Sequence, residues 1–389
     1  MPVPEPSERF PKYLYMSVPH MSGREMPYVQ EAFESNWLSS VGPNLQALEA
    51  AFQDRFGAPC VALSSGTAAI HLGLRLLGVG PGDEVVVPTL TFAASANPVL
   101  YLGGTPVFID SEPQSWNLDP NLLKDFLSKR ASQGRLPKAV VVVHLLGQSA
   151  DLDPILEVCN QYEVPVLEDA AEALGTLYKD KAVGVLGDVG VFSFNGNKII
   201  TSTGGGLLIS KNAAWVEKAR FWSQQARDPG INYLHSEMGY NYRMSNVLAG
   251  IARGQLEVLD ERIEQRRAIA FRYRDAFEHI PGIALMPQAS YGFHINWLSS
   301  FTLEPDVFGM NQRELIDFLK QANVETRPVW KPLHTQKLFQ GNECVGGAVA
   351  EDLNKRGICL PSSSSLSPEE QLFIIERVIE AHELSQVHA

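Results

Sequence analysis

Short apolar runs alternate with amphipathic stretches along the first half of the chain. Runs rich in valine, isoleucine and leucine have the length of buried strands at Glu84–Pro88, Pro106–Asp110, Ala139–His144, Pro165–Glu168, Val189–Phe194 and Gly206–Ser210. Between them, Thr67–Leu77 and Pro154–Tyr162 repeat apolar residues at helical spacing. Buried strands that alternate with helices predict an α/β domain with a mostly parallel sheet.

The pattern changes in the second half of the chain. Residues Ser245–His279 keep helical spacing for about ten turns, which predicts one long helix connecting two domains. A shorter α+β pattern follows, with a strand at Ile295–Thr302 and helices at Asn311–Ala322 and Pro368–His382. We therefore expect a large domain over residues 1–255, including the N-terminal segment, and a smaller C-terminal α+β domain over residues 256–389.

Composition and charge narrow the class of protein. The net charge of −12 disfavours sequence-independent binding to nucleic acid or to anionic membranes, which need clustered positive charge. No run of about 18 apolar residues occurs, so we expect no membrane span, and the polar N-terminus lacks the apolar core of a signal peptide. The four cysteines show no CxxC pattern, which favours reduced thiols in a cytoplasmic protein over disulfides or a metal site.

A turn rich in hydroxyl groups is the first candidate for chemistry. Ser64-Ser65-Gly66-Thr67 follows the apolar run Cys60–Leu63 and begins the helix Thr67–Leu77. Free backbone N–H groups at the positive end of a helix can bind an anion, although an ordinary N-cap has the same residues. The turn matches neither GxGxxG nor GxxxxGK[ST], which disfavours the alternative of an NAD-dependent oxidoreductase and a P-loop enzyme.

Acidic residues follow a candidate buried strand at Leu167–Glu172. Ligands of open α/β sheets bind at the carboxyl ends of strands. A carboxylate there could hold a protonated pyridine nitrogen, which keeps the ring an electron sink. Acids that decorate a helix N-terminus are the competing interpretation.

A lysine follows in the segment Phe192–Lys198, and three glycines come soon after it at Gly204–Gly206. A lysine that forms a Schiff base must be desolvated, and close backbone packing at glycines allows this. A single loop lysine is usually solvated. The interpretation rests on the order of phosphate turn, strand-end aspartate and lysine.

This order resembles the fold-type-I aminotransferases, and more narrowly the nucleotide-sugar aminotransferases of the DegT/StrS type. Similar segments run along nearly the whole chain: Leu63–Ala69, Pro88–Asn97, His144–Gln148, Glu168–Glu172, Gly239–Met244 and Arg327–His334. The resemblance implies pyridoxal 5′-phosphate as cofactor, L-glutamate as amino donor and a keto sugar carried on a nucleotide as acceptor. Relatives with histidine in place of the lysine are sugar dehydratases, and Lys198 excludes that branch.

The resemblance also assigns roles to residues. Lys198 would hold the cofactor as a Schiff base and move the proton, Asp169 would pair with the pyridine nitrogen, and Phe92 would stack on the ring. Hydroxyl and backbone groups would bind the cofactor phosphate at Ser65, Gly66, Thr67 and Ser193. Glu172 would contact the O3′ region. Asn241 would reach the phosphate of the neighbouring subunit, which implies a homodimer.

The acceptor sugar is inferred from the opening segment Tyr15–Gly23. It is similar to that of the branch that aminates C4 of UDP-4-keto-6-deoxy-N-acetylhexosamine. The substrate contacts that we expect are His20, Met21, Arg227, Arg327, Trp330 and His334. The two arginines are candidates for diphosphate contacts, because the forked donors of a guanidinium suit phosphate oxygens. The alternatives are amination of GDP-4-keto-6-deoxymannose, as in perosamine synthases, and a catalytically silent protein with the same fold.

Overall fold

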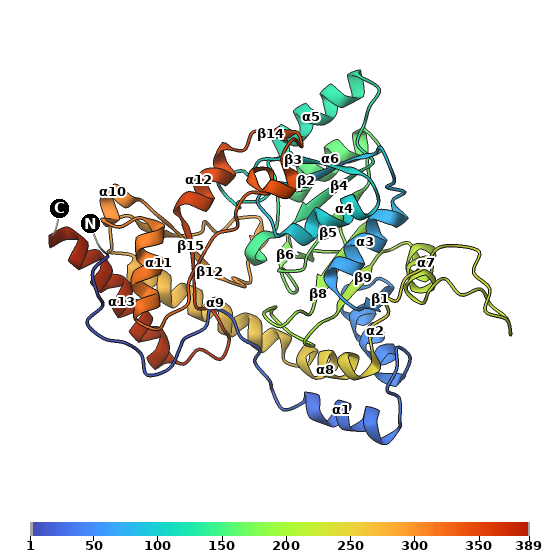
Figure 1. Ribbon diagram of the computed structural model, residues 1–389, viewed down its shortest axis with the longest axis horizontal. Coiled ribbons are helices and arrows are strands. Elements are labelled where there is room, and N and C mark those ends of the chain that lie inside the picture. Colours follow the sequence, from blue (N-terminus) through green and yellow to red (C-terminus); the bar gives the residue numbers. More distant parts are fainter. Residues whose placement is uncertain (1–2, 388–389) are drawn as a thin grey trace.

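The computed structural model describes residues 3–387 and is built around an eight-stranded sheet (Figure 1). Its strands, in spatial order, are β1 (Cys60–Leu63), β9 (Gly206–Ile209), β8 (Val189–Ser193), β5 (Val166–Asp169), β4 (Ala139–Val143), β2 (Glu84–Pro88), β3 (Thr105–Ile109) and β14 (Cys344–Val345). Among the described residues, β9 runs antiparallel to both of its neighbours, β1 and β8, and the other strand pairs of this sheet are parallel. The expected α/β fold with a mixed, mostly parallel sheet is confirmed.

Helices cover both faces of this sheet and lead into the second half of the chain. The helices that precede or pack around the sheet are α1 (Glu25–Glu34), α2 (Pro43–Phe56), α3 (Gly66–Leu76), α4 (Asn97–Tyr101), α5 (Pro120–Ser132), α6 (Leu152–Gln161), α7 (Ala213–Ser223) and α8 (Asn246–Leu256). Helix α3 packs across β5, β8 and β9. A small sheet of β11 (Gly292–Phe293), β6 (Leu177–Tyr178) and β7 (Lys181–Ala182) lies beside them.

A second, antiparallel sheet has its own hydrophobic core. Its strands are β10 (Ile283–Leu285), β12 (Ser299–Leu303), β15 (Gly357–Leu360) and β13 (Arg327–Pro328). The helices of this half are α9 (Leu259–Phe277), α10 (Pro305–Phe308), α11 (Gln312–Gln321), α12 (Ala348–Arg356) and α13 (Pro368–Val387). Among the described residues, no helix combines the length and the apolar character that crossing a membrane requires.

The predicted long helix is interrupted, and this corrects the expectation for Ser245–His279. Helix α8 ends at Leu256 and α9 begins at Leu259, because Val258 has φ −113° and ψ 9° and leaves the helical conformation. The break lets α8 pack against α1 and α2, while α9 runs on to the second core (Figure 1). Likewise, the strand expected at Ile295–Thr302 begins only at Ser299.

The N-terminal segment lies against the second core, although the sequence pattern assigned it to the larger domain. Leu14 forms a parallel bridge with Val324, and the rings of Phe10 and Phe373 are 5.1 Å apart. The division of the chain at residue 255 stays a prediction. Helix α9 contributes to both cores, through Ile263 to the first and Ile269 to the second.

One buried carboxylate joins the two halves of the chain. Asp110, directly after β3, accepts hydrogen bonds from the backbone N–H groups of Gly347 (2.6 Å), Val349 (3.1 Å) and Ala350 (2.9 Å). These are the free N–H groups at the start of α12, where a carboxylate is stabilised by the helix dipole. Asp110 therefore fixes α12 against the edge of the large sheet.

Candidate active site

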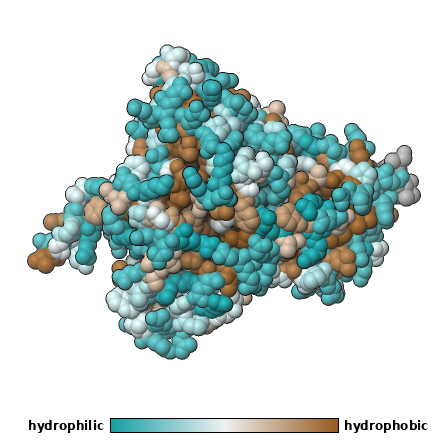
Figure 2. Space-filling view, turned by 180° about the vertical axis from the view of Figure 1, so that it is seen from behind, coloured by the Kyte–Doolittle hydropathy of each residue, from teal (hydrophilic) through white to brown (hydrophobic). Residues whose placement is uncertain are grey.

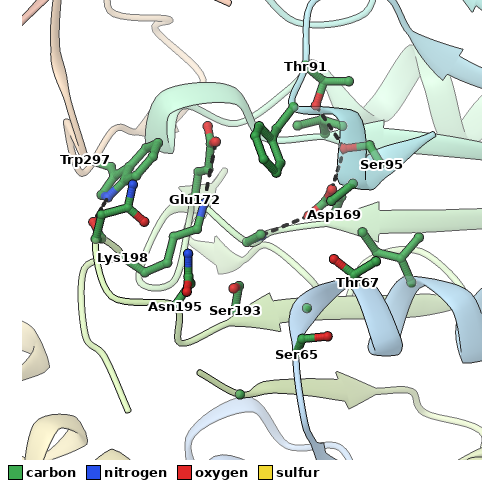
Figure 3. Close-up of a pocket in the computed structure, with 18 of the residues that line it drawn as sticks. Ser65, Thr67, Thr91, Ser95, Asp169, Glu172, Ser193, Asn195, Lys198 and Trp297 are labelled. Carbon is green, nitrogen blue, oxygen red and sulfur yellow. Dashed lines mark hydrogen bonds and ion pairs between the residues drawn. The ribbon is translucent and has the colours of Figure 1, made fainter. Parts of the chain in front are cut away.

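A cavity of about 300 Å³ lies where the parallel strands end. Side chains and backbone from the ends of β4, β5 and β8, from the start of α3 and from the loop after β8 form its wall (Figure 3). The carboxyl edge of an open parallel sheet is the usual place for a ligand. The predicted residues among its lining are Ser65, Gly66, Thr67, Phe92, Asp169, Glu172, Ser193, Lys198 and Trp330.

The N-terminus of α3 forms one end of this cavity. Ser65 caps the helix, and its Oγ accepts the N–H of Ala68 at 3.0 Å. Gly66 leaves a cradle open, because a Cβ there would lie 2.9 Å from Cβ of Ser193. The hydroxyl groups of Thr67 and Ser193 also line the cavity. Hydroxyl donors at the positive end of a helix suit a phosphate group.

Asp169, at the end of β5, is a buried carboxylate. Its Oδ2 accepts the Ser95 hydroxyl at 2.7 Å, and its Oδ1 accepts the Ala171 N–H at 3.1 Å. Thr91 Oγ1 lies 2.9 Å from Ser95 Oγ and extends the chain of hydrogen bonds. Within residues 3–387 no lysine, arginine or histidine pairs with this carboxylate, although a buried charge is costly without a partner. A protonated ring nitrogen in the cavity would supply that partner.

Lys198 and Glu172 lie next to each other in the lining of the cavity (Figure 3). The Lys198 Nζ lies 3.6 Å from Glu172 Oε1 and 4.3 Å from the centroid of the Trp297 ring. The backbone N–H of Leu146 donates to Glu172 Oε2 at 2.8 Å. Burial raises the pKa of Glu172, and the Lys198 ammonium opposes that shift. The amine is thus held between a carboxylate and an aromatic face.

Glu168 has a different role from its neighbour Asp169. Successive residues of a strand point to opposite faces, and Glu168 accepts hydrogen bonds from His144 Nε2 (3.0 Å) and from the N–H groups of Gly184, Leu186 and Gly187. Burial acts to raise the pKa of Glu168, but these hydrogen bonds outweigh it and lower the pKa. Glu168 holds a loop in place and does not line the cavity.

The other residues predicted to bind substrate or cofactor lie outside this lining. His20 Nδ1 lies 3.0 Å from Ser364 Oγ, Arg327 pairs with Glu325, and His334 lies between Thr89 and Glu351. The side chains of Met21, Arg227 and Asn241 are exposed. Trp330, in contrast, lines the cavity, and the centroid of its ring lies 5.9 Å from that of Phe92.

Sequence reasoning missed Ser95 and Trp297. Ser95 lies in the similar segment Pro88–Asn97, so its proximity to the strand end was a usable signal. Trp297 is far from Lys198 in the chain, and nothing in the local pattern indicates that its ring covers the amine. Trp297 could not be placed without the tertiary contacts.

The donor set fits pyridoxal 5′-phosphate. The open cradle at Gly66 suits its phosphate, the unpaired carboxylate of Asp169 suits its ring nitrogen, and the amine of Lys198 suits its aldehyde. The three groups line one cavity, whose volume is at the lower end of small-molecule sites, about 300–1,000 Å³. With such a cofactor bound, a lysine amine, a carboxylate and an anion site together can support amino transfer.

Comparison with known proteins agrees with this chemistry. The model of the DegT/DnrJ/EryC1/StrS aminotransferase family matches residues 19–379. EpsN of Bacillus subtilis, to which a pyridoxal phosphate-dependent aminotransferase activity is attributed, is 51% identical over 371 residues, covering 94% of this chain and 95% of EpsN. The GDP-perosamine synthase of Caulobacter vibrioides is 37% identical over 94% of this chain and 96% of its own.

Solved structures lead to the same family. The aminotransferase TlmJ of Streptoalloteichus hindustanus superposes with a TM-score of 0.86 at 29% identity, covering 97% of this chain and 100% of TlmJ. A DegT DnrJ EryC1 StrS aminotransferase of Brucella abortus gives 0.86 at 26% identity, over 92% of this chain and 95% of its own. The chain therefore belongs to the DegT/DnrJ/EryC1/StrS family and is a pyridoxal phosphate-dependent sugar aminotransferase.

Proposed function

We propose that the protein transfers an amino group from L-glutamate to C4 of a nucleotide-linked 4-keto-6-deoxy sugar, with UDP-4-keto-6-deoxy-N-acetylglucosamine as acceptor. The product would serve the synthesis of a cell-surface glycan or a glycoprotein sugar. The observation that carries the amino-transfer proposal is the shared cavity of Lys198, Asp169 and the cradle at Gly66. Pyridoxal phosphate, when bound, supplies an electron sink for the carbon that loses its proton.

The residues of the cavity have separate tasks in this proposal. Lys198 would hold the cofactor, and its amine would move the proton between Cα of glutamate and C4′ of the cofactor. Asp169 would pair with the ring nitrogen and keep it protonated, and Phe92 would stack on one face of the ring. Ser65, Gly66, Thr67 and Ser193 hold the phosphate. Glu172, which forms an ion pair with Lys198 at 3.6 Å, would contact the O3′ side of the cofactor.

A homodimer is part of the proposal, because Asn241 does not line the cavity of its own chain. Near it, the segment 227–238 projects from the body of the molecule and carries exposed apolar side chains, among them Ile231 (97% exposed) and Tyr233 (78%) (Figure 2). Apolar side chains on a projecting segment favour contact with a second protein. In the dimer, Asn241 would bind the phosphate in the partner's cavity.

The acceptor nucleotide is the finer part of the proposal. The segment containing His20 and Met21 is anchored beside the lysine loop, since Ser17 Oγ donates to the Asn197 carbonyl at 3.0 Å. This position supports a role for the segment at the sugar end of the cavity, together with Trp330. Arg227 and Arg327 are proposed to bind the diphosphate of the nucleotide sugar. GDP-4-keto-6-deoxymannose is the second candidate acceptor, supported by similarity to GDP-perosamine synthases at 34–37% identity.

The experiment runs the second half of the reaction backwards. The purified enzyme is loaded with pyridoxal phosphate and mixed in turn with UDP-, GDP- and dTDP-linked 4-amino-6-deoxy sugars, and the absorbance of the bound cofactor is followed. We expect the UDP sugar to change the spectrum and Lys198→Ala to abolish turnover. A response to the GDP sugar alone would transfer the assignment to the perosamine type. Absence of any response, to glutamate as well, would favour a silent regulatory protein.

A further inference from the structure

The backbone carbonyl directly before Lys198 is held by two donors from distant parts of the chain. The Asn197 carbonyl oxygen accepts the Ser17 hydroxyl at 3.0 Å and the Trp297 indole N–H at 2.8 Å. Ser17 belongs to the N-terminal segment, and Trp297 precedes β12. The loop that carries Lys198 is therefore fastened to two segments that lie outside the large sheet.

A single arginine on α9 organises both donors. One guanidinium nitrogen of Arg266 (Nη1) donates to the Trp297 carbonyl, and the other (Nη2) donates to Ser17 Oγ at 3.2 Å. A hydroxyl has one proton to give, so Ser17, which accepts from Arg266, directs its own proton to Asn197. The guanidinium fork fixes both groups in one plane, which the point charge of a lysine cannot do.

Burial of the Arg266 guanidinium at this place is energetically unfavourable. It is 1% exposed, its Nε has no hydrogen-bond partner, and no carboxylate within residues 3–387 forms an ion pair with it. Burial, assisted by the neighbouring Arg262, lowers the pKa of Arg266 to about 9. A buried cation without a counter-ion lowers the free energy of unfolding, so its presence calls for a benefit other than stability.

The position of Arg266 along α9 indicates what that benefit is. It lies between Ile263, which packs in the first core, and Ile269, which packs in the second. We infer that Arg266 is a positioning residue which, through Ser17 and Trp297, clamps the Asn197 carbonyl and so sets the place from which the Lys198 amine acts. The inference rests on the proposed role of Lys198. Trp297 adds a direct contact, because the centroid of its ring lies 4.3 Å from Lys198 Nζ (Figure 3).

Three variants separate the parts of this clamp. Trp297→Phe keeps an aromatic face but removes the indole N–H. Ser17→Ala removes one hydroxyl and leaves every buried charge in place. Arg266→Met removes the fork. Arg267→Met is the matched control, because Arg267 is the next residue on α9 and its Nη1 donates to the His294 carbonyl, yet no bond links it to Asn197.

The first measurement separates kcat from KM for the loaded enzyme. A misplaced catalytic group lowers the rate with little effect on binding, so we expect kcat to fall about tenfold to hundredfold in Arg266→Met and Trp297→Phe. In Arg266→Met, KM for both substrates should stay within about threefold of the wild type, since Arg266 does not line the cavity. Arg267→Met should keep the wild-type kcat.

The second measurement needs no cofactor. The full-length apoprotein is treated with trinitrobenzenesulfonate, and the rate of modification at Lys198 is read by peptide mass spectrometry. Losing one hydrogen bond at Asn197 should speed this reaction about threefold to tenfold in Ser17→Ala and Trp297→Phe, but not in Arg267→Met. If Lys198 were not the cofactor lysine, Lys198→Ala would keep the Schiff-base absorbance of the bound cofactor, whereas the labelling of the other variants would still report on the clamp.

The clamp is overturned if kcat and the labelling rate of the three variants stay within twofold of the wild type. It is equally overturned if Arg267→Met loses as much kcat as Arg266→Met, because the effect would then belong to the whole 293–297 segment. If Arg266→Met does not fold, the labelling rate of Ser17→Ala tests the clamp by itself, because this substitution leaves every buried charge in place.

Discussion

Replacing Asp169 by asparagine tests the electrostatics of the site most directly. The two side chains have the same shape, so Asp169→Asn removes the charge while leaving β5 and the cavity wall in place. Asparagine can still accept one hydrogen bond, but its NH₂ group would face a donor, either the Ser95 hydroxyl or the Ala171 N–H. The ring nitrogen of the cofactor would lose the anion that keeps it protonated.

The size of the effect follows from burial. Removing one partner of a buried ion pair costs about 3–5 kcal/mol, and each 1.36 kcal/mol is tenfold in rate. We therefore expect kcat to fall by roughly 10²- to 10³-fold, at the lower end of that range because asparagine retains one acceptor. Ser95→Ala removes one hydrogen bond to the same carboxylate and should cost about tenfold.

The assay is steady-state amino transfer together with a titration of the apoprotein with pyridoxal phosphate. Glu168→Gln is the matched control, because Glu168 is the preceding residue of β5 and equally buried, yet its bonds go to His144 and the 184–187 loop. It should lower the free energy of unfolding and keep kcat near the wild-type value. A kcat for Asp169→Asn within about threefold of the wild type would refute the assigned charge pair.

The remaining predictions concern a titration, a close contact and a helix cap. Because burial raises the pKa of Glu172, the folded protein keeps a proton there that the unfolded chain releases, so the free energy of unfolding falls as pH rises above the ordinary glutamate pKa. Urea unfolding of Glu172→Gln between about pH 5 and pH 8 should lack this decline, and an unchanged slope would contradict the assignment. Gly66→Ala should weaken cofactor binding about tenfold in an absorbance titration, because its Cβ would crowd Ser193; wild-type affinity would show that the cradle is not needed. Asp110→Ala leaves three N–H groups at the start of α12 without an acceptor and should lower the free energy of unfolding by about 2–4 kcal/mol, whereas Asp110→Asn should cost less; an equal loss in both would argue against the cap.

Much of the fold follows from patterns that the chain displays locally. The valine-rich segments become β2, β4 and β8, and the hydroxyl turn begins α3, because burial on both faces and N-capping act over a few neighbouring residues. The order of turn, strand-end acid and lysine was enough to predict the class of enzyme, since those residues come to one sheet edge whenever the strands run parallel.

The limits of local patterns are visible at Val258 and at residues 168 and 169. The hydrophobic repeat continues through Val258, so a break that depends on packing against α1 and α2 leaves no mark on it. Glu168 and Asp169 are the last two residues of the buried strand β5, and the period of two says only that they face opposite ways. Which of them meets the cavity depends on the loop that folds over the other face.

The sequence by itself thus determined the α/β class and the family, and it predicted the groups proposed to carry the chemistry. The tertiary structure alone decided how those groups are held: Lys198 lies between Glu172 and Trp297, and Arg266 fastens the loop before it. The physical reason is the distance along the chain over which each effect acts. Backbone propensity and side-chain periodicity act between near neighbours, whereas Trp297 and Arg266 reach Lys198 only after two cores have packed along α9.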